Sequence, residues 1–99
     1  MLELGLTGRV AIITGGSDGL GRATALKLAA EGCKVVICAR RDDHLQETAG
    51  AIADETGAEV LGHRADVAIA GDIEALVDAA VARFGGVDIL VNNAGKSAA

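Results

Sequence analysis

The sequence has no tyrosine, tryptophan or proline, and its only aromatic residue is Phe84. Hydrophobic residues still make up 51% of its 99 residues and charged residues 23%, as in an ordinary folded domain with an aliphatic core. The formal net charge of −5 argues against a nucleic-acid-binding surface, because few phosphates could be neutralised. No apolar run is long enough to cross a bilayer, and no basic segment precedes an apolar one at the start. These absences predict a cytoplasmic protein without a membrane partner.

Cysteine is also scarce, with only Cys33 and Cys38. On one extended segment the two would lie roughly 16 Å apart, which is too far for a disulfide. Their spacing is not that of metal ligands either. We therefore expect two reduced thiols, with Cys38 buried as a small hydrophobic residue, and no metal site.

What is present is a regular alternation of strand-like and helix-like patterns. The predicted strands are Arg9–Thr14, Lys34–Ala39, Glu59–Ala65 and Val87–Val91. The predicted helices are Gly19–Glu31, Asp42–Glu55 and a stretch from about Gly71 to Phe84. Glycines follow each helix, and Asp42 or Asp43 is the expected N-cap of the second one.

This βαβαβαβ order predicts an α/β fold, with a parallel sheet covered by helices on both faces. The expected strand order is 3-2-1-4. The second and third strands are added on one side of the first strand, and the chain then crosses over to add the fourth strand on the other side. Ligands bind at such a switch point, outside the carboxyl ends of the strands. The apolar fourth strand would form an open edge of the sheet, so we expect the isolated chain to be marginally stable or to self-associate.

The most informative stretch runs from Thr14 to Gly21 (TGGSDGLG), between the first strand and the first helix. Glycines in such a turn can make a pocket for a dinucleotide pyrophosphate, which the N–H groups of the helix N-terminus attract. Gly15 permits the tight turn, Gly19 allows backbone to approach phosphate, and Gly21 lets the helix pack closely. The alternative is that these glycines serve only the turn.

Two further motifs follow the third and fourth strands, namely Asp66-Val67 and Asn92-Asn93-Ala94-Gly95. Together with the glycine turn they resemble the short-chain dehydrogenase/reductase family, over about Gly5 to Gly95. The resemblance implies a Rossmann-type doubly wound sheet. It also implies hydride transfer between a nicotinamide cofactor and a carbonyl or alcohol substrate.

By this resemblance the turn from Gly15 to Gly21 would hold the pyrophosphate, and Asp66 would bond the adenine amino group. The backbone of Asn92, Ala94 and Gly95 would approach the adenosine ribose, with the asparagine side chains bracing the sheet. Asp66 could instead cap a turn into the third helix. The candidate cofactor-binding residues are Gly15, Ser17, Asp18, Gly19, Leu20, Gly21, Arg40, Arg41, Asp66, Val67, Asn92, Ala94 and Gly95.

The end of the second strand bears on which cofactor is bound. NAD-preferring members carry an acid there, whereas this chain has Ala39 followed by Arg40 and Arg41. A guanidinium can form paired hydrogen bonds to a 2′-phosphate, so NADP is expected, with NAD as the alternative. Asp18 opposes this assignment, because NADP-preferring relatives often have a basic residue at its position. Arg40 and Arg41 could also be a solvated loop pair.

The family's catalytic tyrosine, with a lysine one helical step later, has no counterpart here, because the sequence contains no tyrosine. We therefore expect residues 1–99 to be the N-terminal, cofactor-binding part of a single dinucleotide-binding domain, inactive alone. The full-length protein would be a homo-oligomer by the same resemblance, and its substrate stays open. The alternative is a non-catalytic nucleotide-binding or regulatory module.

Overall fold

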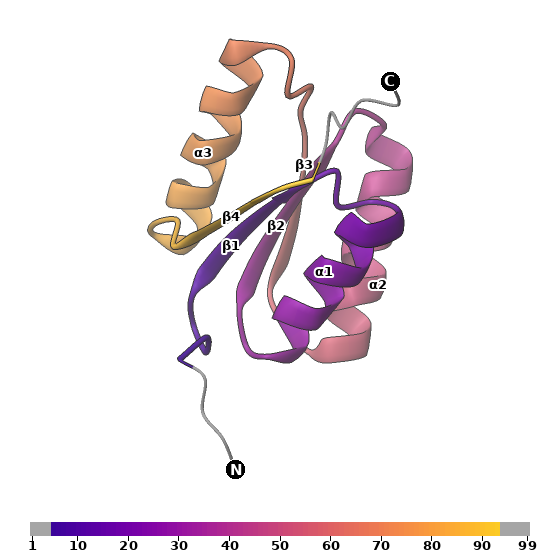
Figure 1. Ribbon diagram of the computed structural model, residues 1–99, viewed down its shortest axis with the longest axis vertical. Coiled ribbons are helices and arrows are strands. Elements are labelled where there is room, and N and C mark those ends of the chain that lie inside the picture. Colours follow the sequence, from indigo (N-terminus) through magenta and orange to yellow (C-terminus); the bar gives the residue numbers. More distant parts are fainter. Residues whose placement is uncertain (1–4, 94–99) are drawn as a thin grey trace.

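The computed structural model describes residues 5–93, in which strands and helices alternate along the chain (Figure 1). The strands are β1 (Val10–Thr14), β2 (Lys34–Ala39), β3 (Val60–Arg64) and β4 (Ile89–Asn92). The helices are α1 (Gly19–Ala30), α2 (Asp42–Thr56) and α3 (Ala70–Phe84). All these bounds except the start of β4 lie within one residue of the sequence prediction.

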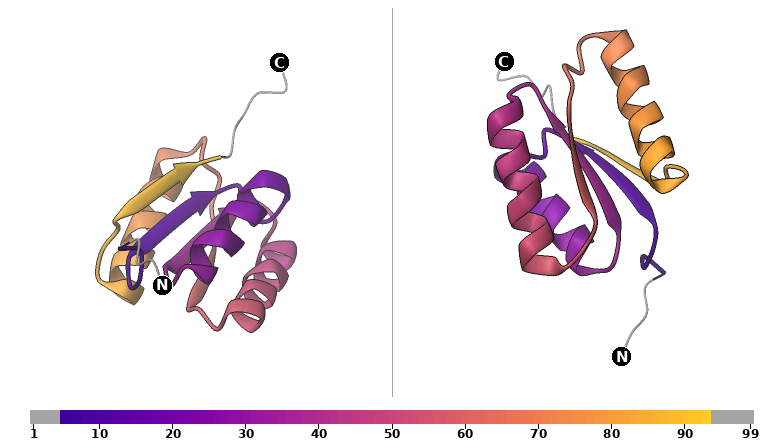
Figure 2. Two further views of the ribbon diagram at one scale, coloured as in Figure 1. Left: turned by 60° about the horizontal axis from the view of Figure 1, so that its bottom comes forward. Right: turned by 180° about the vertical axis from the view of Figure 1, so that it is seen from behind.

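The four strands form one parallel sheet in the order β3-β2-β1-β4, which confirms the predicted topology. β1 lies inside the sheet, with Ile12 opposite Val36 of β2 on one side and Leu90 of β4 on the other. α1 and α2 cover one face of the sheet and α3 covers the other (Figures 1 and 2). The structure is therefore the doubly wound α/β arrangement expected from the pattern.

Each face of the sheet has its own aliphatic core. Ile13 and Ile37 pack beneath α1 and α2 with Leu45 and Ile52, all fully buried. On the opposite face Ile12 and Val36 pack with Leu76 and Ala80 of α3. The single aromatic residue, Phe84, lies only at the margin of this second cluster.

Two predicted boundaries are wrong. Strand β4 begins at Ile89 rather than Val87, because the Asp88 carboxylate accepts the Val10 N–H at 2.8 Å, where a strand would offer a backbone carbonyl. The N-cap of α2 is Arg41, and neither Asp42 nor Asp43 caps it. Both aspartates lie in the first helical turn instead, where the helix dipole favours negative charge.

The two cysteines are buried and free, as expected. Burial raises the pKa of both thiols above the ordinary value, so they stay protonated at neutral pH. Within residues 5–93 no helix combines the length and the apolarity that spanning a bilayer would require.

The side of β4 facing away from β1 has no strand partner among residues 5–93 (Figure 2). Leu90 in this strand is 65% exposed.

We predict that the 99-residue chain self-associates through this edge and that Leu90→Lys shifts it toward the monomer, because a charge blocks edge pairing. Sedimentation velocity measures the change. Ile69→Lys, at another exposed apolar residue away from the sheet edge, is the matched control; equal effects of the two variants would contradict the prediction.

Candidate functional site

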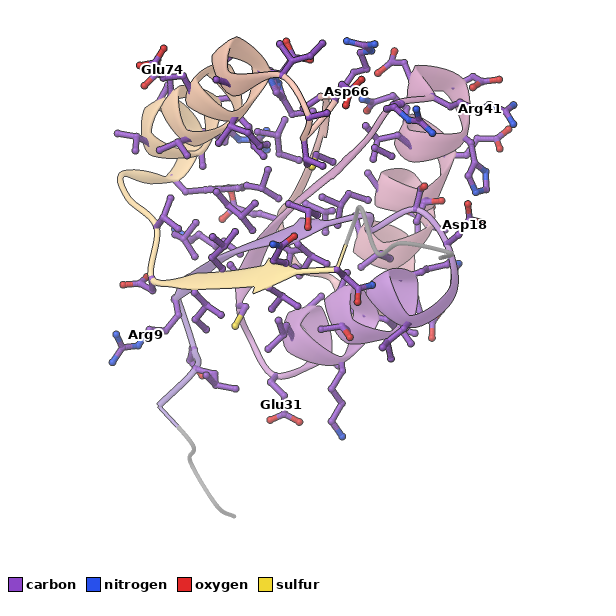
Figure 3. The ribbon with its side chains drawn as sticks, turned by 45° about the horizontal axis from the view of Figure 1, so that its top comes forward. Arg9, Asp18, Glu31, Arg41, Asp66 and Glu74 are labelled. Carbon is purple, nitrogen blue, oxygen red and sulfur yellow. The ribbon has the colours of Figure 1, made fainter. Side chains whose placement is uncertain are left out.

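A cavity of about 390 Å³ opens at the carboxyl edge of the sheet. Its walls are the residue after β1 (Gly15), the end of β2 (Cys38, Ala39 and Arg40) and the loop after β3 (Ala65, Asp66, Val67 and Ala68). In Figure 3, Asp18, Arg41 and Asp66 lie around this end of the molecule, whereas Arg9 and Glu31 lie at the other. The topology thus brings together residues from three separate predicted motifs.

The first part of the glycine turn is fixed to the neighbouring strand. The N–H groups of Gly15 and Gly16 both donate to the Cys38 carbonyl, at 3.0 and 3.2 Å. These two donors are therefore used within the protein. An anion at this turn would meet N–H groups further along, at the start of α1.

The glycines of the turn answer different steric demands. Gly19 has a φ of +54°, in the left-handed region that side chains disfavour. A Cβ at Gly21 would overlap the carbonyl oxygen of Gly15, so α1 can start this close to β1 only without a side chain there. Gly16 was not predicted as a site residue, yet a Cβ there would lie 2.7 Å from the Ile37 side chain.

The N-terminus of α1 leaves backbone donors open. Arg22 is the first residue whose N–H is paired, with the Asp18 carbonyl at 3.1 Å. The N–H groups of Gly19, Leu20 and Gly21 have no acceptor among residues 5–93, as expected for a first helical turn. Three donors and the positive end of the helix dipole thus converge at one point, which suits an anionic group.

Helix α2 braces the glycine turn at two points. Thr48, which is buried, donates its hydroxyl to the Ser17 carbonyl at 3.3 Å. The His44 ring lies 2.9 Å from a carboxylate oxygen of Asp18. Neither bracing residue was predicted, because each partner lies more than 20 residues away in the sequence and no local pattern joins them.

The end of β2 places the two predicted arginines differently. Arg40 lines the cavity, and its carbonyl accepts a hydrogen bond from the Arg64 guanidinium at 3.2 Å. Arg41 does not line the cavity and pairs with Asp43 at 3.4 Å. The His44 N–H and the Arg41 charge hold the pKa of Asp43 below its ordinary value, so this carboxylate stays ionised beside Arg41.

The loop after β3 is held by a second carboxylate. Asp72 of α3 accepts the Asp66 N–H at 2.9 Å and pairs with Arg64 at 3.5 Å. One carboxylate oxygen of Asp66 accepts the Ala68 N–H at 2.9 Å, which is the turn-capping role considered as an alternative. Its other oxygen has no hydrogen-bond partner among residues 5–93. Asp66 can therefore cap its own turn and still accept a bond from a ligand.

The predicted motif that follows β4 meets the site through Thr14 at the end of β1. The Thr14 hydroxyl accepts the Asn93 N–H at 2.8 Å and lies 3.0 Å from the Asn92 side-chain oxygen. The Asn92 side-chain oxygen thus contacts the end of β1, next to the backbone contact of Asn93. The predicted residues Ala94 and Gly95 lie outside the described residues.

Comparison with known proteins identifies relatives of the chain. Residues 9–99 match the family model described as short chain dehydrogenase. The chain is 46% identical over 90 residues to the levodione reductase of Leifsonia aquatica, covering 90% of this chain and 34% of that protein. It is 40% identical over 90 residues to a 3-oxoacyl-(acyl-carrier-protein) reductase of Synechocystis, covering 91% and 36% respectively. The chain spans about a third of the length of these curated relatives.

A solved structure has the same fold over this chain. The L-sorbose reductase from Gluconobacter frateurii, crystallised with NADPH and L-sorbose, superimposes on the chain with a TM-score of 0.93 at 42% identity. The match covers 98% of this chain and 37% of that one.

The contact between α1 and β1 can be tested through folding stability. We predict that Gly21→Ala lowers the free energy of unfolding by about 1–3 kcal/mol, because the added methyl group is forced against the Gly15 carbonyl. Gly50→Ala is the matched control, since a Cβ there in α2 meets nothing within 4 Å. We expect this control to stabilise the chain by about 1 kcal/mol, the difference in helix propensity. Urea unfolding followed by circular dichroism measures both, and equal stability of the two variants would refute the packing argument.

The pair of His44 and Asp18 makes a prediction about pH. The hydrogen bond and charge of Asp18 raise the pKa of His44 above 6.5, although the positive charge of Arg41 opposes this. A raised folded-state pKa contributes stability below pH 6.5 that is lost as pH rises through the folded pKa. NMR titration of the ring should therefore give a pKa above 6.5, and Asp18→Asn should lower it. An unchanged pKa in this variant would show that Asp18 is not the cause.

Proposed function

Since the chain belongs to the short-chain dehydrogenase/reductase family, we propose that it forms the cofactor-binding part of an NADP(H)-dependent oxidoreductase. The bound cofactor supplies hydride transfer between its nicotinamide and a carbonyl or alcohol carbon. The residues of this chain bind and orient the adenosine half of the cofactor. Residues 1–99 then constitute the N-terminal part of a single dinucleotide-binding domain.

Two parts of the adenosine half, the pyrophosphate and the adenine, have matching groups at the carboxyl edge of the sheet. The open N–H groups of Gly19, Leu20 and Gly21 suit the pyrophosphate. The free carboxylate oxygen of Asp66 suits the exocyclic amine of adenine. The chain around Asn92, Ala94 and Gly95 is assigned to the ribose through the family resemblance.

The observation that carries the NADP assignment is the end of β2. Ala39 leaves no carboxylate to bind the ribose hydroxyls or to repel a 2′-phosphate. Arg40 lines the same cavity, and no carboxylate among residues 5–93 forms an ion pair with it. Its guanidinium is therefore available to a phosphate. The L-sorbose reductase, which was crystallised with NADPH, supports the same choice.

The names of the similar proteins refer to different carbonyl compounds, namely levodione, L-sorbose and 3-oxoacyl-(acyl-carrier-protein). We therefore propose a carbonyl or alcohol substrate as a class and no individual compound. None of the 99 residues is a tyrosine, so the general acid of the family's reaction is not among them. A nucleotide-binding role without catalysis is the second candidate function for these residues.

The cofactor assignment is tested with two nucleotides that differ by one phosphate. We predict that the chain binds adenosine 2′,5′-bisphosphate about tenfold more tightly than 5′-AMP, as one charge-assisted interaction with Arg40 would give. Isothermal titration calorimetry measures both affinities. Arg40→Gln should abolish the preference.

Arg41→Gln is the matched control, since Arg41 is already paired with Asp43 and lies outside the cavity. We expect it to change the preference no more than about twofold. Equal affinities for the two nucleotides in the wild-type chain would overturn the NADP assignment. Absence of binding by either nucleotide would overturn the proposed site as a whole.

A further inference from the structure

Asp18 presents a conflict at the proposed phosphate site. It is the N-cap residue of α1, with the extended backbone (φ −142°, ψ 161°) of an ordinary N-cap. An aspartate at this position usually accepts the N–H of the second or third helical residue, here Leu20 or Gly21. That bond would occupy donors that a pyrophosphate needs, and it would set a negative charge beside the phosphates.

The structure avoids this outcome. The Asp18 side chain makes no capping hydrogen bond, and its carboxylate lies 2.9 Å from the His44 ring on α2 instead. The ring comes from another element, and α2 is fixed to the same turn by the buried contact of Thr48 with the Ser17 carbonyl. The position of His44 relative to Asp18 is thus set by the fold.

We infer that His44 is a positioning residue, which keeps the phosphate site at the start of α1 open by holding the Asp18 carboxylate away from the helix N–H groups. This inference rests on the proposed function. His44 touches no part of the cofactor in this role and acts only through Asp18.

The charges around the ring support this role. Asp18 approaches the ring from the glycine turn, the Arg41 charge acts on it from the N-cap of α2, and Asp43 accepts the backbone N–H of His44 (Figure 3 labels Asp18 and Arg41). Arg41 is paired with Asp43, and the carboxylate paired with the His44 ring is that of Asp18. The Asp18 contact raises the pKa of His44, so the ring gains positive charge where it offsets the carboxylate.

The test uses ADP-ribose, whose pyrophosphate does not titrate near neutral pH. We expect His44→Gln to weaken ADP-ribose binding about fivefold, the size of one capping interaction, because the released carboxylate then competes with the pyrophosphate. Asp18→Ala and the double variant Asp18→Ala/His44→Gln should both bind at least as tightly as the wild-type chain, since alanine has neither a charge nor a hydrogen-bond acceptor that competes with the pyrophosphate. Titration calorimetry at constant salt gives the four affinities.

His63→Gln is the matched control, because His63 lies on β3 and its side chain has no hydrogen-bond partner among residues 5–93. Its affinity should equal that of the wild-type chain. Wild-type affinity in His44→Gln would overturn the inference. So would a double variant as weak as His44→Gln, because the loss would then not pass through Asp18.

A measurement without ligand separates this inference from the proposed function. In His44→Gln the amide protons of Leu20 and Gly21 should exchange more slowly with solvent, because the Asp18 carboxylate now accepts them. In the double variant they should exchange about as fast as in the wild-type chain. If ADP-ribose binds to none of the proteins, the proposed function fails, while the exchange rates still decide the role of His44: slower exchange supports it and unchanged exchange overturns it.

Discussion

The pairing of β1 on both sides is the constraint on which the rest of the structure depends. All five residues of this strand are buried, because it lies between β2 and β4 and beneath helices on both faces. Its carboxyl end is consequently held by both neighbours. The Cys38 carbonyl takes the N–H groups of Gly15 and Gly16, and the Thr14 hydroxyl takes the N–H of Asn93. The site is thus assembled by the same pairing that buries the core.

That pairing also determines which backbone N–H groups of the glycine turn stay open. The N–H groups of Gly15 and Gly16 donate to the Cys38 carbonyl of β2, so the open donors are those at the start of α1. α1 can begin there only because Gly21 has no side chain to meet the Gly15 carbonyl. A steric requirement on one glycine and a hydrogen-bond requirement on two others therefore act together to leave the open donors at the start of α1.

The strand order, the glycine turn after β1 and the burial of β2 could be predicted from the sequence, because they follow from local patterns and from general rules of α/β topology. The start of β4 could not, since it depends on the Asp88 side chain taking the Val10 N–H. The role of Gly16 was missed because its neighbour, Ile37, lies on another strand. His44, Thr48 and Asp72 were missed for the same reason, since each acts on a partner that local sequence does not place.

The tertiary contacts also resolve the charge conflict that the sequence presents at the end of β2. Read in order, residues 40–43 and Asp18 mix two cations with three carboxylates, so the acidic residues weaken the NADP prediction that Ala39 and Arg40 make. In the fold Arg41 is paired with Asp43, Asp18 is paired with His44, and Asp42 accepts a hydrogen bond from Gln46. Arg40 is the charged residue of this group without a side-chain partner among residues 5–93, and it is also the one that lines the cavity. Local charge at the candidate site is therefore set by which residues are paired, and a net count along the sequence does not show that Arg40, within the described part of the chain, is left unpaired at the cavity.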